Sequence, residues 1–335
     1  MTKIAVALAL TLCMGLGAGI ASAAAKKDYI FGVGSPGGAW EMVGTAMAKV
    51  LNQYATYRLI PTSTTTTMMN PTAMNTGETA FAVGSFDIYE RAFKGIDSFK
   101  GHPTPNIRQV LSIYDNVMGF LVLGNSKIQA MDDITDKTII ASPPGNYVNI
   151  GSYLRVMKEV GILKANPDVV QKNIRRVTYA QSVDQLSDGN ADIAYVTGYP
   201  YNGNADSVIS TKGARFIPVS KDPEVEKRFR AEFDKQNTDL TMLPIRKGTY
   251  STSDADVYGP VFYTCIYSSK DTPDDVVKEF MALSIKYMKE ISEITPTASG
   301  MTLEANKRNL ESGIMQLERM HPAAIAYFKE MGIIK

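Results

Sequence analysis

The apolar residues of this chain recur at two spacings that alternate along the sequence and predict strands followed by helices. Residues 29–34 form a short apolar run, and between Trp40 and Tyr54 apolar residues recur every three or four positions, as on one face of a helix. A second strand is predicted at residues 57–60. This strand–helix–strand succession is typical of a mostly parallel sheet.

The same succession returns in the second half of the chain. Residues 138–141 predict a strand, residues 142–146 a proline- and glycine-rich loop, and the apolar positions from Ile150 to Val160 a helix. Residues 77–83 and 189–195 also resemble each other, at nearly the same offset. These repeats predict two similar α/β halves, although the identical residues are few and a chance similarity is the alternative.

Two further apolar stretches with strand character, residues 117–123 and 261–267, are candidates for the segments that cross between the halves. The sequence therefore predicts an α/β protein with a two-lobed, periplasmic-binding-protein-like (type II) fold and two hinge strands. Lobe 1 is predicted to comprise residues 26–120 plus 263–335 and lobe 2 residues 121–262, with a ligand cleft between them. Further helices are predicted at residues 274–291 and 322–331.

The first residues predict an export signal. Lys3 provides the positive start, residues 4–20 form an apolar run, and residues 21–23 are small, as at a cleavage site. A single-pass anchor is the alternative, but glycines interrupt the run and it is shorter than about 20 apolar residues. We therefore expect residues 1–25 to be a cleaved signal peptide and the mature protein to be soluble and periplasmic.

Charge and cysteine content narrow the possible partners. The chain has 35 basic and 34 acidic residues, and loss of Lys3 with the signal peptide balances them, so no basic face for nucleic acid is expected. The mature chain retains one of the two cysteines, Cys265, and cannot form an internal disulfide. Its stability must come from burial of apolar surface.

Residues 32–37 match the dinucleotide-binding pattern G-x-G-x-x-G between a strand and a helix. The acidic residue expected after the second strand is missing, because Ile60 is followed by proline, threonine and serine. An exported protein also has little access to nicotinamide cofactors, so no cofactor is expected.

Glycines at a helix start still let the unpaired backbone N–H groups of the first turn approach an anion. The chain offers such a start at residues 37–39 and again at 145–147, and we predict that the two converge across the cleft on one small acid. The alternative is two ordinary strand-to-helix turns.

Polar and aromatic residues after the predicted strands complete the candidate site. The hydroxyls of Ser63 and Thr64 follow the second strand, where capping of the next helix is the alternative role. Other candidates follow the paired strands or flank the loops, with surface positions as the alternative. The candidate ligand-binding residues are Gly37, Gly38, Trp40, Ser63, Thr64, Ser85, Ser142, Gly145, Asn146, Tyr147, Asn149, Tyr199 and Tyr201.

Catalytic and metal-binding patterns find little support. The two histidines, His102 and His321, each precede a proline, where surface or capping roles are expected, and one cysteine with two scattered histidines does not make a zinc site. The chain has no G-x-S-x-G motif and no P-loop. We expect a protein that is not an enzyme, with an exported hydrolase as the less favoured alternative.

Several segments share a resemblance to one known family: residues 34–40, the threonine-rich loop 63–67, residues 134–137, 142–145 and 245–250, and the closing segment 321–332. They resemble the TAXI branch of the TRAP-transporter solute receptors. The resemblance implies a two-lobed periplasmic receptor, expected to be monomeric, that delivers a small acid such as glutamate or 2-oxoglutarate to TRAP membrane permease subunits driven by an ion gradient. An accessory protein that presents its ligand to a sensor kinase would look the same.

Two departures from this family put the ligand in doubt. Trp40 stands where the family usually has tyrosine, and the family's second loop, Gly-Ser-Gly-Thr, is replaced by a segment containing Asn146, Tyr147 and Asn149 after Gly145. No arginine can be assigned to a carboxylate clamp, so anion recognition is expected to use backbone and uncharged donors.

Overall fold

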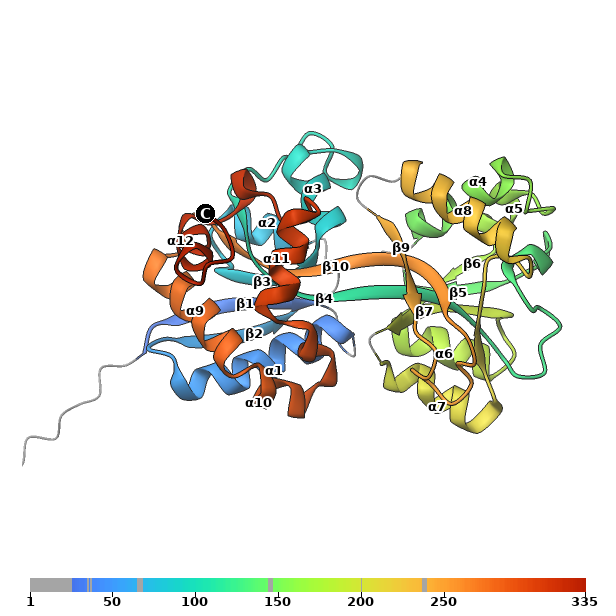
Figure 1. Cartoon of the computed structure of the whole chain (residues 1–335), viewed down its shortest axis with the longest axis horizontal. Coiled ribbons are helices and arrows are strands. Elements are labelled where there is room, and N and C mark those ends of the chain that lie inside the picture. The colour runs from blue at the N-terminus through green and yellow to red at the C-terminus, as the bar shows by residue number, and fades with distance from the viewer. Residues whose placement is uncertain are drawn as a thin grey trace, which may run out of the picture.

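The computed structural model describes residues 26–34, 36, 38–64, 69–143, 147–199, 201–236 and 240–335, with the side chains of residues 147–149 excepted. Two α/β lobes lie side by side, and two long antiparallel strands pass from one lobe to the other (Figure 1). These strands are β4 (Ile107–Val122) and β10 (Val257–Ser269). The α/β, two-lobed fold with two hinge strands is as the sequence predicts.

Lobe 1 contains both ends of the described chain. Its elements are β1 (Asp28–Gly34), α1 (Ala39–Tyr54), β2 (Arg58–Ser63), α2 (Met69–Asn75), β3 (Phe81–Ser85), α3 (Phe86–Lys94), α9 (Asp274–Lys286), α10 (Met288–Ile294), α11 (Leu303–Glu311) and α12 (Pro322–Glu330). Short 3₁₀ turns, η1 (Asp97–Phe99), η4 (Pro296–Gly300) and η5 (Leu317–Arg319), connect some of them.

Lobe 2 is the middle of the chain. Its elements are η2 (Met131–Asp133), β5 (Ile140–Ser142), α4 (Tyr147–Glu159), α5 (Pro167–Lys172), β6 (Ile174–Arg176), α6 (Tyr179–Ser187), β7 (Ile193–Tyr199), α7 (Gly203–Lys212), β8 (Arg215–Ile217), α8 (Pro223–Gln236) and β9 (Thr241–Ile245).

The strand order shows that the two lobes are built alike. The sheet runs β2-β1-β3-β10-β4-β7-β5-β6, with β8 beside β4 and β9 beside β10. In lobe 1, β2, β1 and β3 are parallel and β10 joins them antiparallel; in lobe 2, β6, β5 and β7 are parallel and β4 joins them antiparallel. The similarity between the two halves of the sequence therefore corresponds to a repeated arrangement of strands.

Each lobe has its own hydrophobic core. In lobe 1 the apolar face of α1, which includes Met47 and Leu51, packs with α9 and α12 against the sheet, and its cluster reaches Tyr114 on β4. The lobe 2 cluster begins on β4 at Met118. A further cluster joins the lobes, because it contains Val117 together with Phe86 and Ile314 of lobe 1. The predicted lobe boundaries at residues 120 and 262 fall within these two crossing strands.

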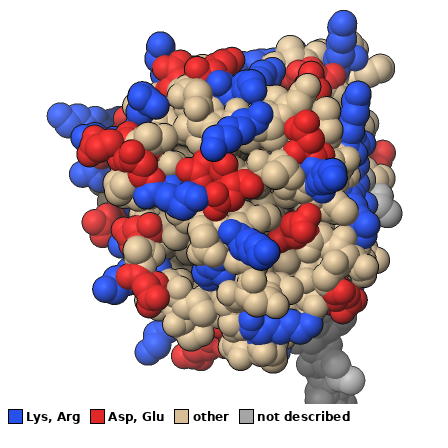
Figure 2. Space-filling model, turned by 90° about the vertical axis from the view of Figure 1, so that its right-hand side faces the viewer, with Lys and Arg blue, Asp and Glu red and all other residues tan. Residues whose placement is uncertain are grey.

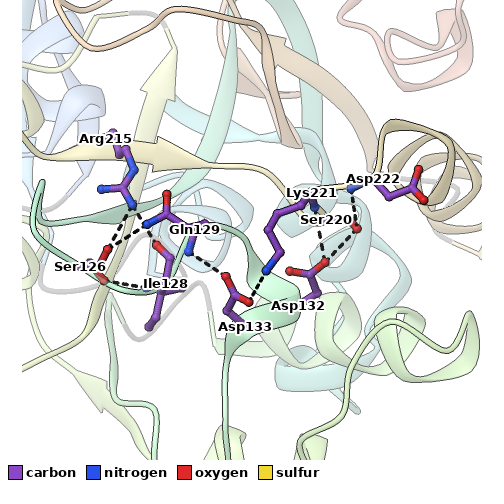
Figure 3. A network of polar contacts seen from close by, with 9 residues as sticks. All are labelled: Ser126, Ile128, Gln129, Asp132, Asp133, Arg215, Ser220, Lys221 and Asp222. Atoms are coloured by element: carbon purple, nitrogen blue, oxygen red, sulfur yellow. Dashed lines mark hydrogen bonds and ion pairs between the residues drawn. The ribbon is translucent and has the colours of Figure 1, made fainter.

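A polar network fastens the first segment of lobe 2 (Figure 3). The Arg215 guanidinium donates to the carbonyl oxygens of Leu123 and Ile128 at 3.0 and 3.1 Å, and also to those of residues 124 and 126. Nearby, Lys221 Nζ lies 2.6 Å from a carboxylate oxygen of Asp133. Because carbonyls of an irregular segment need donors, Arg215 replaces the hydrogen bonds that a strand would supply.

Acidic and basic side chains are intermingled on the outer end of lobe 2, which faces the viewer in Figure 2. The balanced composition of the chain is thus also a balanced distribution on this face. Among the described residues, no helix combines the length and apolarity that a bilayer span requires.

Candidate functional site

A crevice lies between the lobes and is lined from both sides. Its described lining residues are Gly38, Ala39, Met42, Tyr114, Tyr179, Thr197, Tyr201, Asn202, Asn204 and Thr297. They come from the start of α1, from β4 and η4, and, in the opposite lobe, from β7, the start of α6 and the segment that leads into α7. None of these described lining residues carries a charged side chain.

Lobe 1 contributes the start of α1. Gly38 is the N-cap, is buried, and provides no side-chain cap to the first turn. Its carbonyl accepts the backbone N–H of Met42 at 3.1 Å, whereas the N–H groups of the preceding helical residues lie at the positions that have no acceptor within a helix. The positive end of the helix dipole is therefore directed at the crevice.

Lobe 2 contributes the segment between β7 and α7. Asn202 caps α7 by accepting the backbone N–H of Asn204 at 3.0 Å, and its side-chain amide donates to the Thr197 carbonyl at 3.2 Å. The Tyr250 hydroxyl accepts the backbone N–H of Asn202 at 2.9 Å. These bonds hold the wall in place, since each end of the segment is tied to a neighbouring element.

Two tyrosine hydroxyls of the crevice stay protonated at neutral pH: Tyr201 in the lobe 2 wall and Tyr114 on β4, which forms the floor. Burial raises the pKa of Tyr114 above its ordinary value, and the hydrogen bond to Asp206 raises that of Tyr201. The Tyr201 hydroxyl donates to Asp206 at 2.8 Å, while its ring is 48% exposed at the rim of the crevice. The site thus presents uncharged hydroxyl and amide groups.

The candidate residues of lobe 1 lie at different depths. Trp40 is half-buried in the first turn of α1 and donates its ring N–H to Thr264 Oγ1 at 3.3 Å. Ser63 is exposed and donates to Glu41 at 3.3 Å, and Thr64 donates its backbone N–H to the Gly34 carbonyl at 2.9 Å. Ser85 is fully buried at the N-cap of α3.

The candidate residues of lobe 2 are less completely placed. Ser142 is buried at the end of β5, where its hydroxyl donates to the Pro143 carbonyl at 3.2 Å, and half-buried Tyr199 packs on the cluster that contains Val117. Gly37, Gly145 and Asn146 lie outside the described residues, as do the side chains of Tyr147 and Asn149 in α4. Ligand contact by these residues stays a prediction.

Of the candidates, Gly38 and Tyr201 belong to the described crevice lining, as does Ala39 of the predicted helix start at residues 37–39. Sequence reasoning missed the other lining residues. Asn202 had a usable signal, because asparagine before Gly203 and an apolar helical pattern indicates a helix cap. Tyr114 and Thr297 had none, since they reach the crevice from distant parts of the chain through the hinge strand and η4.

A larger groove of about 400 Å³ lies elsewhere on lobe 1. Apolar residues dominate its lining, among them Leu310, Met315 and Leu317. All of its lining residues belong to lobe 1, so it is separate from the crevice between the lobes.

The architecture and the position of the crevice define the class: the chain has the two-lobed fold of periplasmic solute-binding proteins. The chain belongs to the NMT1-like family, whose model matches residues 31–332.

Solved structures are similar in fold. The structure of a periplasmic transporter is 10% identical, with 81% of this chain and 87% of that chain covered and a TM-score of 0.51. The periplasmic aliphatic sulphonate binding protein from Escherichia coli is 11% identical over 93% of this chain and 90% of that chain, with a TM-score of 0.46. No curated protein shows significant sequence similarity to the chain.

Proposed function

We propose that this protein is the periplasmic receptor of a solute transporter, and that it closes around a small carboxylate-bearing metabolite without reacting with it. The observation that carries the proposal is the crevice between two hinged lobes, where the uncapped start of α1 faces hydroxyl and amide groups of the opposite lobe. Backbone N–H groups at a helix start suit a carboxylate. The fold and the family support the receptor class.

In the proposed mechanism the solute bridges the two walls, and β4 and β10 bend to bring the lobes together. Closure removes water from the crevice, which strengthens the hydrogen bonds to the bound acid. The TAXI resemblance supports delivery to a TRAP permease, with the signal peptide directing the receptor to the periplasm. Uptake of labelled solute that requires both receptor and permease would separate this role from presentation to a sensor kinase.

The ligand class is tested by native mass spectrometry of the purified mature protein, followed by a thermal-shift panel of amino acids, organic acids, sugars and metals. A bound acid at a hundredfold excess over its dissociation constant stabilises the protein by about 2.7 kcal/mol. A panel in which sugars or metals shift the melting temperature and acids do not would contradict the proposal.

The role of the α1 start is tested with Gly38→Asp, which places a negative charge where the carboxylate should bind. We expect binding of the acid to be lost while the protein still folds. The matched control is Pro273→Asp, which places the same charge at the N-cap of α9 in the same lobe. Unchanged affinity in the Gly38 variant, measured by calorimetry, would refute the role of this helix.

A further inference from the structure

Three hydroxyl side chains form a row across adjacent strands at the point where the lobes join. Thr264 of β10 lies directly opposite Ser85 of β3 on one side and Tyr114 of β4 on the other. Residues directly opposite each other in a sheet place their side chains on the same face. Ser85, Thr264 and Tyr114, here called the hydroxyl row, therefore point the same way.

The hydroxyl row is buried, yet the hydrogen bonding of its members is incomplete. Ser85 and Thr264 are 0% exposed and Tyr114 is 4% exposed. The Ser85 oxygen is shielded from water and has no hydrogen-bond partner among the described residues. The Tyr114 oxygen is equally shielded; it interacts with Thr264 and Trp40 but forms no well-aligned hydrogen bond with a described residue. The Thr264 hydroxyl oxygen accepts one hydrogen bond, from the Trp40 ring N–H. Buried polar groups in folded proteins are nearly always paired, so this row needs an explanation.

The position of the row connects it with the crevice. Tyr114 is itself a lining residue together with Gly38 and Ala39, and Trp40 reaches the row from the first turn of the same helix. On the opposite face of β4, Asp115 is paired with Arg308 at 2.9 Å. The row thus belongs to the face of the hinge strands that forms the floor of the crevice.

An unpaired side-chain oxygen, that of Asn116, lies further along this face of β4. Asn116, two residues beyond Tyr114, is 5% exposed, and its side-chain oxygen also has no partner among the described residues. Alternate residues of a strand share a face, so Asn116 extends the floor towards lobe 2. Polar side chains whose hydrogen bonding is incomplete therefore share one floor, which is the arrangement expected of a ligand contact.

We propose that the hydroxyl row binds an uncharged hydrogen-bonding group of the solute, an amide, carbonyl or hydroxyl, while the start of α1 binds its carboxylate. This rests on the proposed receptor function and narrows its ligand class. A second carboxylate at the floor would be buried with no basic side chain among the described lining residues, which is costly. Hydroxyl groups can both donate to and accept from an uncharged polar group.

The row also explains how binding is transmitted to the hinge. Tyr114 and Thr264 belong to the two strands that cross between the lobes, so a solute bound to the row contacts the hinge itself. A ligand that pairs these atoms favours whichever bend of β4 and β10 brings them to hydrogen-bonding distance.

The test compares matched acids and matched hydroxyl deletions. Calorimetry on the mature protein uses L-glutamine with L-glutamate, L-asparagine with L-aspartate, and succinamate with succinate. In the pair whose length suits the crevice, we expect the amide to bind at least tenfold more tightly than the corresponding diacid. Tyr114→Phe and Ser85→Ala should each lower that affinity at least tenfold. Ser85→Ala should do so without lowering the melting temperature of the ligand-free protein, because its deleted hydroxyl is unpaired.

Tyr57→Phe is the matched control. The Tyr57 hydroxyl is also buried and unpaired among the described residues, but it lies in the lobe 1 core and does not line the crevice. Its deletion should leave affinity unchanged. Tight binding of a diacid, or full affinity in Tyr114→Phe and Ser85→Ala, would overturn the role of the row and leave the receptor function standing. Failure of every acid to bind would overturn both.

Discussion

Replacement of Gly259 by alanine should disturb the point where the two hinge strands separate. Val261 of β10 is the last residue paired with β4, opposite Val117, and beyond it β10 continues along β9. A Cβ at Gly259 would lie 1.7 Å from the backbone oxygen of Met118. Since such contacts are not found below 3.0 Å, one strand must move by more than an ångström.

The expected loss in the free energy of unfolding follows from the fact that the obstacle is the backbone carbonyl of Met118. Overpacking a buried site costs about 1–3 kcal/mol, and the upper end, about 3 kcal/mol, applies here because a backbone carbonyl cannot rotate away as a side chain can. Urea unfolding followed by circular dichroism gives the free energy of unfolding by linear extrapolation.

Gly203→Ala is the control for this prediction. A Cβ there meets nothing within 4 Å, and the residue begins α7, so we expect unchanged or slightly raised stability. A Gly259→Ala protein within about 0.5 kcal/mol of the wild type would refute the close approach of β10 to β4 as a constraint.

Two further predictions concern pH and the network of lobe 2. Burial lowers the pKa of His321, whose Nδ1 accepts the Ala323 N–H and caps α12, so its contribution to stability is complete above its ordinary pKa of 6.5 and is lost as the pH falls below that value. His321→Asn should flatten the urea stability profile between pH 7.5 and 5, whereas replacement of exposed His102 should not; an unchanged profile would refute this assignment. Arg215→Met should lower the free energy of unfolding by about 2 kcal/mol, because it leaves backbone carbonyls unpaired, and Lys221→Met, which breaks an exposed ion pair, should hardly change it. Equal effects of the two replacements would contradict the anchoring role of Arg215.

The sequence predicted most of the fold because the signals were local. The helix over Ala39–Tyr54 has apolar residues at helical spacing, and the same faces are buried in the lobe 1 core. The crossing strands were recognisable as apolar runs, but nothing local shows how far β4 extends towards Ile107, since its first half is paired with β10 from the other end of the chain. Strand length here depends on a partner distant in sequence.

The candidate site was predicted less completely than the fold. Gly38 and Tyr201 could be found because a helix start and a strand end mark their positions locally. Tyr114 could not, since its hydroxyl becomes notable through burial beside Thr264, which lies far from it in sequence and separates it from Ser85. Unpaired polar atoms are a property of packing, and a linear pattern of residue types does not record them.

The exchange of strands has a consequence for how the molecule unfolds. β10 is hydrogen-bonded to the parallel strands of lobe 1, and β4 to those of lobe 2. Because β10 and β4 are also hydrogen-bonded to each other, each strand contacts both halves. If one half unfolded, the crossing strand of the other half would lose a hydrogen-bonded neighbour, and its edge would be exposed. The two halves should therefore lose their structure in a single cooperative step, although each also has a core of its own.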